Sequence, residues 1–237
     1  MKNMKLNEVR KVIRLTDPLS PEKTAYNLIQ DIKRPSPKFS YAITRRNAEA
    51  IFKGDMTENQ ITLSCSNGSK QSQKCNKEAS LKLLEAAPLL RKDPVMCRND
   101  IKPVIFKFKQ NHAIMIKPQF FYTDNGKVFI VWIQFCKTDH YTLFHLNLIS
   151  TLMKKEYGEN FDHPEIIIID LSAPNKSSTR GIRIFRSSDH EPLSDRHIES
   201  FFDVYIQGVE IAENNGYQVT SPYEENDLRD DDQGNLI

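Results

Sequence analysis

The apolar and polar positions in the middle of the chain predict a two-stranded antiparallel ribbon. Apolar side chains dominate residues 120–123 and 128–135, and the polar sequence Asp124-Asn125-Gly126 separates the two segments. Asn and Gly tolerate the positive φ angles that a tight two-residue hairpin turn requires. We therefore expect the two segments to pair with each other through this turn.

Another hairpin is predicted immediately before this ribbon. Residues 104–108 alternate apolar and basic side chains, residues 110–112 are turn formers, and residues 113–116 are again mostly apolar. Two short alternating segments around a polar turn are typical of a β-hairpin. We expect this hairpin to feed directly into the central ribbon.

After the ribbon the pattern changes to the helical period. A helix is predicted from a cap at Thr138 or Asp139 to Gly158, with a broad apolar face that suits packing on a sheet. Four consecutive isoleucines at 166–169 indicate a strand buried on both faces. Strand, helix and strand together predict a right-handed parallel crossover, and residues 182–185 predict one more strand.

Helices are predicted near both ends of the chain. Ser20 and Pro21 form a helix start, and Ser194 caps a carboxy-terminal helix with a continuous apolar stripe. Thr44 is a plausible cap for a helix over residues 45–53 that stops at Gly54.

The composition of residues 64–76 changes to Ser, Asn, Gln, Gly and Lys, which indicates a surface loop. Asn76 then caps a helix that ends or bends at Pro88.

These elements predict a mixed α/β (α+β) fold with a central sheet that has helices on both faces. We expect a mainly helical amino-terminal region over residues 1–100, an α/β core over residues 101–221 and an acidic, disordered tail over residues 222–237.

Charge is distributed unevenly along the chain. Residues 1–120 hold 23 Lys and Arg against 11 Asp and Glu, whereas residues 121–237 hold 10 against 20. Such asymmetry is found in proteins that bind nucleic acid or an acidic partner, and it also fits two halves that neutralise each other. The candidate binding residues are Arg45, Arg46, Lys70 and Lys74 in the basic half, and Lys176, Arg180 and Arg183 among Ser and Thr near residue 180. Solvated arginines are the commoner explanation for Arg45 and Arg46, and a solvated loop with an edge strand explains the group near residue 180 about as well.

The cysteine and histidine spacing does not predict a metal site. The four cysteines form no Cys-x-x-Cys pair, and His140 and His145 are five residues apart, off the helical spacing of two ligands. The amino terminus lacks a signal-peptide core, and no apolar run approaches the roughly 20 residues of a membrane span. We expect a cytoplasmic protein without a membrane segment, with reduced thiols.

Residues 103–172 contain a meander, a helix and a buried strand, with Pro118 and a polar residue entering one strand and Ile133 between two other residues on the next. This arrangement resembles the core of the PD-(D/E)XK nuclease superfamily, and the resemblance implies a restriction-endonuclease-like core. In that family an Asp and an acid-x-Lys pair hold Mg²⁺ and activate water.

The resemblance places the family's Asp on Gln119, its second acid on Trp132 and its Lys on Gln134. None of these three side chains has the required chemistry, so the resemblance implies a derivative that has lost its catalytic site, with no cofactor. Acids at other positions, Asp124 in the turn and Asp170 after the isoleucine strand, are the candidates for a relocated site.

Three interpretations of function follow. The first is a non-catalytic, nuclease-like α/β domain that binds nucleic acid or a protein partner. The second is a metal-dependent nuclease that uses relocated acids and Mg²⁺. The third is a structural or oligomer-forming protein that uses the apolar stripe of the carboxy-terminal helix. The pattern leaves the oligomeric state open.

Overall fold

The computed structural model describes residues 5–34, 40–91, 95–109, 112–174 and 179–219. The chain divides into two compact units, each built from separate segments of the sequence. The first unit contains Met1–Ser36, Pro103–Ile116 and Leu193–Ile237, and the second contains Pro37–Lys102 and Lys117–Pro192. This division differs from the predicted boundary at residue 100, and the predicted acidic tail lies outside the described residues.

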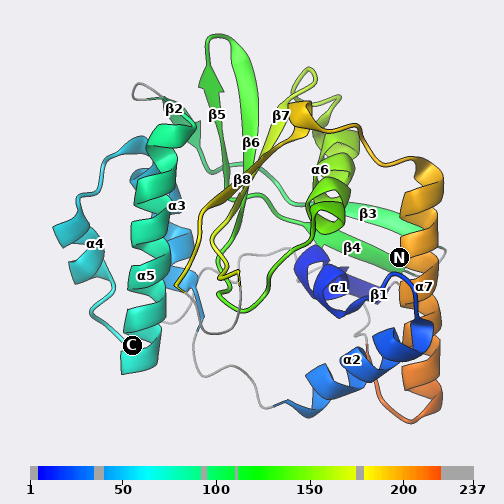
Figure 1. Ribbon diagram of the computed structural model, residues 1–237. Coiled ribbons are helices and arrows are strands. Elements are labelled where there is room, and N and C mark those ends of the chain that lie inside the picture. Colours follow the sequence, from blue (N-terminus) through cyan, green and yellow to red (C-terminus); the bar gives the residue numbers. More distant parts are fainter. Residues whose placement is uncertain (1–4, 35–39, 92–94, 110–111, 175–178, 220–237) are drawn as a thin grey trace. The chain divides into compact units, whose positions relative to one another are not determined.

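A five-stranded mixed sheet forms the centre of the second unit (Figure 1). Its strands follow the order β2-β5-β6-β7-β8, with bounds Met96–Arg98, Phe120–Asp124, Lys127–Gln134, Glu165–Asp170 and Arg183–Arg186. The predicted ribbon is present as β5 and β6, which pair antiparallel. Asn125 and Gly126 have φ angles of 49° and 77°, as a turn with two positive φ angles requires.

The predicted parallel crossover is also present. Strand β6 pairs in parallel with β7, and α6 (Leu143–Tyr157) connects them. All six residues of β7 are buried, as the isoleucine run predicted. The helix begins later than expected, because Thr142, not Thr138 or Asp139, accepts a hydrogen bond from the backbone of His145 and caps it.

Helices cover both faces of this sheet, as predicted (Figure 1). Helices α3 (Ala42–Lys53) and α5 (Lys70–Ala86) pack on one face, where Ile51, Phe52 and Leu83 join the side chains of β5, β6 and β7. Helix α6 lies on the other face. The short elements α4 (Glu58–Ser64), η1 (Ala87–Leu89) and η2 (Ser187–Asp189) complete the described part of this unit.

The prediction of a loop over residues 64–76 is wrong for the second half of this segment. Helix α5 begins at Lys70 with Ser69 as its cap, so half of the expected loop is helical. Asn76 lies inside this helix and is buried, and Thr44 is not the cap of α3 but a buried residue of its first turn. These polar side chains are buried because they bind each other, as described below.

The first unit contains a three-stranded sheet and three helices among its described residues. Strand β1 (Lys5–Glu8) pairs in parallel with β4 (His112–Ile116), which pairs antiparallel with β3 (Val104–Lys109). The helices are α1 (Val9–Leu15), α2 (Pro21–Lys33) and α7 (Asp195–Asn214). The hairpin of β3 and β4 was therefore predicted correctly, but it belongs to this sheet and does not extend the ribbon of β5 and β6.

Helix α7 forms the core of the first unit with α2 and β3. The ring of Phe202 stacks on Phe108 at a centroid distance of 4.1 Å, and Gly208 lets α7 approach Thr24 of α2 closely. The apolar stripe of α7 is thus buried within its own unit, which removes the observation that favoured an oligomer-forming role.

Both units combine helices with mixed sheets, so the predicted α+β class is confirmed. None of the helices in the described part of the chain has the length and apolar character that crossing a membrane requires.

Candidate functional site

Gln119, Trp132 and Gln134, the three positions on which the resemblance places nuclease catalytic residues, make contacts within the protein. Trp132 is fully buried in β6, and its ring stacks on Tyr141 at 5.9 Å. Gln134, at the end of the same strand, is also buried. Its side chain accepts a hydrogen bond from the backbone N–H of Cys136 at 3.1 Å and donates one to the carbonyl of Asp139 at 3.2 Å.

Gln119 directly precedes β5 and hydrogen-bonds to the neighbouring strand β6. Its backbone N–H donates to the carbonyl of Val131, and its side-chain oxygen accepts a hydrogen bond from the backbone N–H of Ile133. The side chain therefore pairs with a backbone group of β6 beyond the end of the regular ladder. In these contacts both glutamines satisfy backbone groups of the sheet and the loop that follows it.

The two relocated acids lie at opposite ends of β6. In the strand register, Asp124 of β5 lies opposite Lys127 at the start of β6, and Asp170 of β7 lies opposite Gln134 at its end. Seven residue steps along β6 separate these positions, roughly 23 Å at the usual rise of a strand. The two carboxylates therefore cannot bind the same metal ion. Within the described ranges, no group of three or more His, Cys, Asp or Glu side chains is placed to hold a metal.

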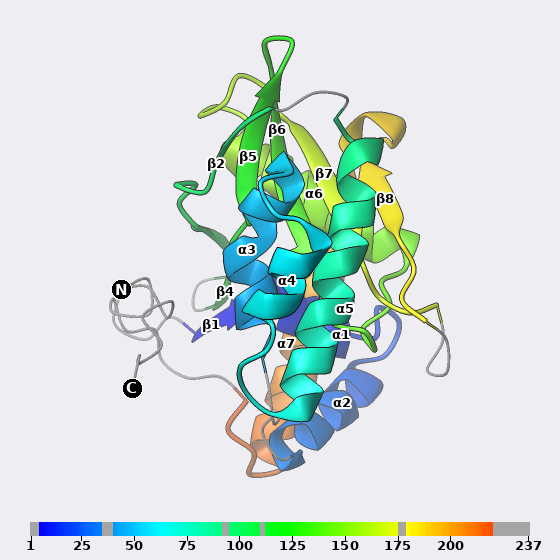
Figure 2. The ribbon, with the colours of Figure 1, turned by 90° about the vertical axis from the view of Figure 1, so that its left-hand side faces the viewer.

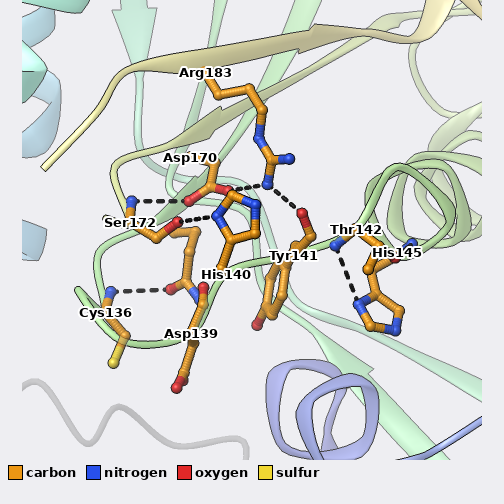
Figure 3. A network of polar contacts seen from close by, with 10 residues as sticks. Cys136, Asp139, His140, Tyr141, Thr142, His145, Asp170, Ser172 and Arg183 are labelled. Atoms are coloured by element: carbon orange, nitrogen blue, oxygen red, sulfur yellow. Dashed lines mark hydrogen bonds and ion pairs between the residues drawn. The ribbon is translucent and has the colours of Figure 1, made fainter. Parts of the chain in front are cut away.

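A polar network instead occupies the carboxyl ends of β6 and β7 (Figure 3). Asp170 accepts a hydrogen bond from the backbone N–H of Ser172 at 2.9 Å and forms an ion pair with Arg183. Arg183 also donates to the carbonyl of Tyr141, and the Ser172 hydroxyl lies 3.2 Å from Nδ1 of His140. The network joins β7, β8 and the loop before α6, which gives each of its groups a structural reason to be there.

His145 lies beside this network in the first turn of α6 (Figure 3). Burial lowers its pKa from the ordinary 6.5 to about 4. Its Nδ1 accepts a hydrogen bond from the backbone N–H of Thr142 at 3.4 Å, which requires that nitrogen to be unprotonated. His145 is therefore neutral in the folded protein at neutral pH.

Two of the three predicted phosphate-binding residues near residue 180 make internal contacts. Arg180 is only 5% exposed; its guanidinium donates to the carbonyls of Phe135 and Leu171 and to the hydroxyl of Tyr41, at 2.7, 3.0 and 2.7 Å. Arg183 binds Asp170, as described above. The third residue, Lys176, lies outside the described residues.

The contact with Arg180 also affects Tyr41. Burial raises the pKa of the Tyr41 hydroxyl, and the neighbouring positive charge of Arg180 opposes this rise without cancelling it. The hydroxyl is therefore protonated at neutral pH, and its oxygen accepts the hydrogen bond from the guanidinium.

The four predicted cations of the basic half lie on the two helices that cover one face of the sheet (Figure 2). Arg45 ends the first turn of α3 and Arg46 begins the second, and both are exposed; Lys70 and Lys74 are exposed in the first half of α5. Lys77 continues the row, because residues 70, 74 and 77 share one side of a helix. We call these five residues the α3–α5 basic face.

The row of lysines points away from the sheet. On α5 the buried side chains are Cys75, Asn76, Ala79, Ser80, Leu83 and Ala86, which occupy the opposite side of the helix. Lys77 is not among the predicted binding residues, because the sequence pattern places all three lysines near or inside a loop. The spacing of four and then three residues was the signal that predicts a shared helical face.

The α3–α5 basic face is not neutralised by neighbouring acids. The other cations of these helices are paired: Lys53 with Glu49 and Asp55, and Lys82 with Glu85. Glu78, the acid nearest to the row of lysines in sequence, lies 3.8 Å from Nε of Arg180. Within the described part of the chain, no ion pair involves any of the five residues. Their charges are therefore available to an anionic partner.

Comparisons with known proteins do not assign a family. Neither the family models nor the curated proteins give a match to this chain. Among solved structures, the one titled "Crystal structure of SSO0001" is similar with a TM-score of 0.33 and 11% identity, over 78% of this chain and 83% of that chain. So distant a likeness says nothing about activity or ligand.

Proposed function

We propose that the second unit is a non-catalytic, nuclease-like α/β domain that binds nucleic acid through the α3–α5 basic face. The observation that supports this most directly is the set of five cations on two adjoining helices, four of them exposed and Lys77 partly buried, none of which pairs with an acid among the described residues. Cations in this state can neutralise backbone phosphates, and releasing the counterions of the nucleic acid drives binding.

The nuclease-like descent rests on the order and pairing of the elements. Strands β5 and β6 form an antiparallel pair, α6 follows, and β7 returns parallel to β6. The resemblance to the nuclease superfamily was drawn from residues 103–172, which include the hairpin of β3 and β4. Because this hairpin belongs to the first unit, residues 117–172 are the part of the resemblance that supports the proposal. Because Gln119, Trp132 and Gln134 bind the protein's own backbone or rings, we expect no metal-dependent cleavage at these positions.

The test is binding of a fluorescently labelled, random-sequence DNA duplex to the full chain over a range of salt concentrations. The variant Arg45→Gln, Arg46→Gln, Lys70→Gln, Lys74→Gln removes four charges of the basic face. If each charge neutralises one phosphate, the slope of log Kobs against log salt becomes shallower by about 3 to 4.

The matched control removes four exposed charges elsewhere, with Lys102→Gln, Lys107→Gln, Lys117→Gln and Arg196→Gln. We expect this control to bind like the unsubstituted protein, although it has the same net charge as the first variant. An equal loss in both variants would show a general charge effect and would contradict the proposed site. If the protein binds polyglutamate but neither DNA nor RNA, the result would indicate an acidic protein as the partner.

A further inference from the structure

A fully buried polar cluster joins the two helices of the basic face. Thr44 of α3 and Asn76 and Ser80 of α5 have no exposed surface. The side-chain oxygen of Asn76 accepts hydrogen bonds from the backbone N–H and from the hydroxyl of Thr44, both at 3.0 Å. Ser80 donates its hydroxyl proton to the hydroxyl oxygen of Thr44 at 3.1 Å. We call these three residues the α3–α5 clamp.

The clamp supplies the capping bond that α3 lacks. The first four backbone N–H groups of a helix have no partner within the helix, and a side chain at the N-cap usually satisfies one of them. Tyr41 is the N-cap of α3 and makes no such bond. The amide of Asn76, from another helix, instead accepts the N–H of Thr44 in the first turn.

Asn76 also fixes the backbone on either side of this contact. Its side-chain nitrogen donates to the carbonyl of Ser40 at 2.9 Å, just before α3, and to the carbonyl of Ser72 at 3.0 Å, one turn earlier in α5. A single buried side chain therefore holds the start of α3 against the first half of α5. Leaving these buried groups without partners costs free energy, so the arrangement is specific.

The clamp residues are close in sequence to the charges of the basic face. Arg45 and Arg46 follow Thr44 in sequence, and Lys74 and Lys77 flank Asn76. We propose that Asn76 is a positioning residue that holds the two arginines in a fixed register with the row of lysines, so that a polyanion contacts both groups at once. This inference rests on the proposed function, because it concerns the same face.

The physical reason is the cost of ordering. If the start of α3 frays into its second turn, Arg45 and Arg46 must be ordered again whenever a ligand binds, and that entropy reduces the affinity. With the turn held in place, binding by the lysines presents the arginines to the same ligand at a high effective concentration.

A double-mutant cycle measures this coupling in the full chain with the labelled DNA duplex as the probe. In the unsubstituted background, Arg45→Gln with Arg46→Gln is expected to weaken binding about tenfold at low salt. In the Asn76→Ala background the same pair is expected to change binding by less than about threefold, because the arginines are no longer held in register. Lys70→Gln with Lys74→Gln should have the same effect in both backgrounds.

An equal effect of the arginine pair in the two backgrounds would overturn the positioning role, because a residue that serves only stability leaves the individual contributions unchanged. If Asn76→Ala does not fold, Thr44→Val decides the question. This milder change removes the hydroxyl contacts of the clamp and keeps the backbone bond, and it is expected to reduce the effect of the arginine pair by a smaller factor.

Amide hydrogen exchange of the unsubstituted protein tests the clamp without any ligand. We expect the N–H of Thr44 to be protected like those in the middle of α3, and exchange as fast as at Ala42 would overturn the clamp. If the duplex does not bind at all, the proposed function and the positioning role both fail, while protection of Thr44 still reports whether the clamp exists.

Discussion

Gln119 and Gln134 both bind backbone groups, and these contacts explain why an amide is suitable at each position. An amide offers both a donor and an acceptor, and Gln134 uses both on backbone groups of the loop that follows β6. A carboxylate would lose the donor to Asp139, and a lysine would lose the acceptor for Cys136. The amide therefore provides hydrogen-bond partners for both backbone groups of this loop, which neither a carboxylate nor a lysine can do.

His145 gives the folded protein a specific dependence on pH. The pKa is about 4 in the folded protein, against 6.5 for an ordinary histidine. Below pH 6.5 the unfolded chain binds a proton that the folded protein does not, so this contribution to stability is present above pH 6.5 and is lost as the pH falls towards 4. The full difference corresponds to about 3 kcal/mol in the free energy of unfolding.

The measurement is urea unfolding of the full chain between pH 7 and pH 4.5, compared with the variant His145→Gln. Glutamine can still accept the N–H of Thr142 at this position of the helix, but it does not titrate. We expect the loss of stability on acidification to be smaller in the variant. Parallel pH profiles for the two proteins would show that His145 is protonated in the fold or does not contribute.

At the scale of single residues, the sequence identified which positions are unusual but not what they bind. That Gln119, Trp132 and Gln134 differ from the two acids and the lysine of the nuclease motif could be seen at once, because a motif is defined by residue types at fixed spacing. That Gln119 pairs with the backbone of Ile133 depends on where β5 begins, and that Asn76 binds Thr44 depends on contact between residues 32 positions apart. Neither is encoded in local spacing.

At the scale of elements, the contact between α2 and α7 depends on one glycine. A Cβ atom at Gly208 would lie 2.5 Å from Cγ2 and 2.8 Å from Cβ of Thr24. Both distances are shorter than atoms can approach, so Gly208→Ala must push the helices apart or distort them. We expect a loss of about 2 kcal/mol in the free energy of unfolding, measured by urea denaturation.

The compensating variant is Thr24→Ser in combination with Gly208→Ala. Serine removes the Cγ2 methyl group but keeps the hydroxyl, which accepts a hydrogen bond from the N–H of Asp17 and donates one to the carbonyl of Ser20. Part of the lost stability should return in the double variant. Strictly additive losses would place the strain somewhere other than at this contact.

Local pattern predicted several elements well, for reasons that the structure makes clear. Ser194 caps α7 and Ser20 caps α2, because a capping side chain acts within one turn of the chain. The predicted start of α5 was wrong because the first turns of this helix are polar. Ser, Gln and Lys suit a loop as well as the solvent side of a helix. The sequence contains the row of lysines, but only the helix places them on one side.

At the scale of the whole molecule, the arrangement of segments into two units is the part that the sequence could not supply. Residues 103–116 belong to the same unit as segments from both ends of the chain. Within this unit β4 pairs with β1, which lies about a hundred residues earlier. The apolar pattern of β3 and β4 is equally compatible with the sheet of the second unit. The charge asymmetry, in contrast, was visible in the sequence, and the basic face of the second unit is drawn from the basic half.

Because each unit has its own packed core, we expect a local change to weaken one unit more than the other. Gly208→Ala strains the first unit. In the second unit Gly54 ends α3 with a φ of 87°, which alanine adopts at a cost of about 1 kcal/mol. Native-state hydrogen exchange reports the free energy of opening at each backbone amide and so separates the two responses.

Gly208→Ala should reduce protection mainly in α2, α7 and the sheet of β1, β3 and β4, whereas Gly54→Ala should reduce it mainly in α3, α5 and the sheet around β6. The two variants act as controls for each other, since both exchange glycine for alanine at a helical position or helix end. If either substitution lowers protection equally throughout the described chain, the two units open as one cooperative structure, and division into separately stable parts is wrong. Opposite patterns in the two variants would establish that the cores are energetically distinct.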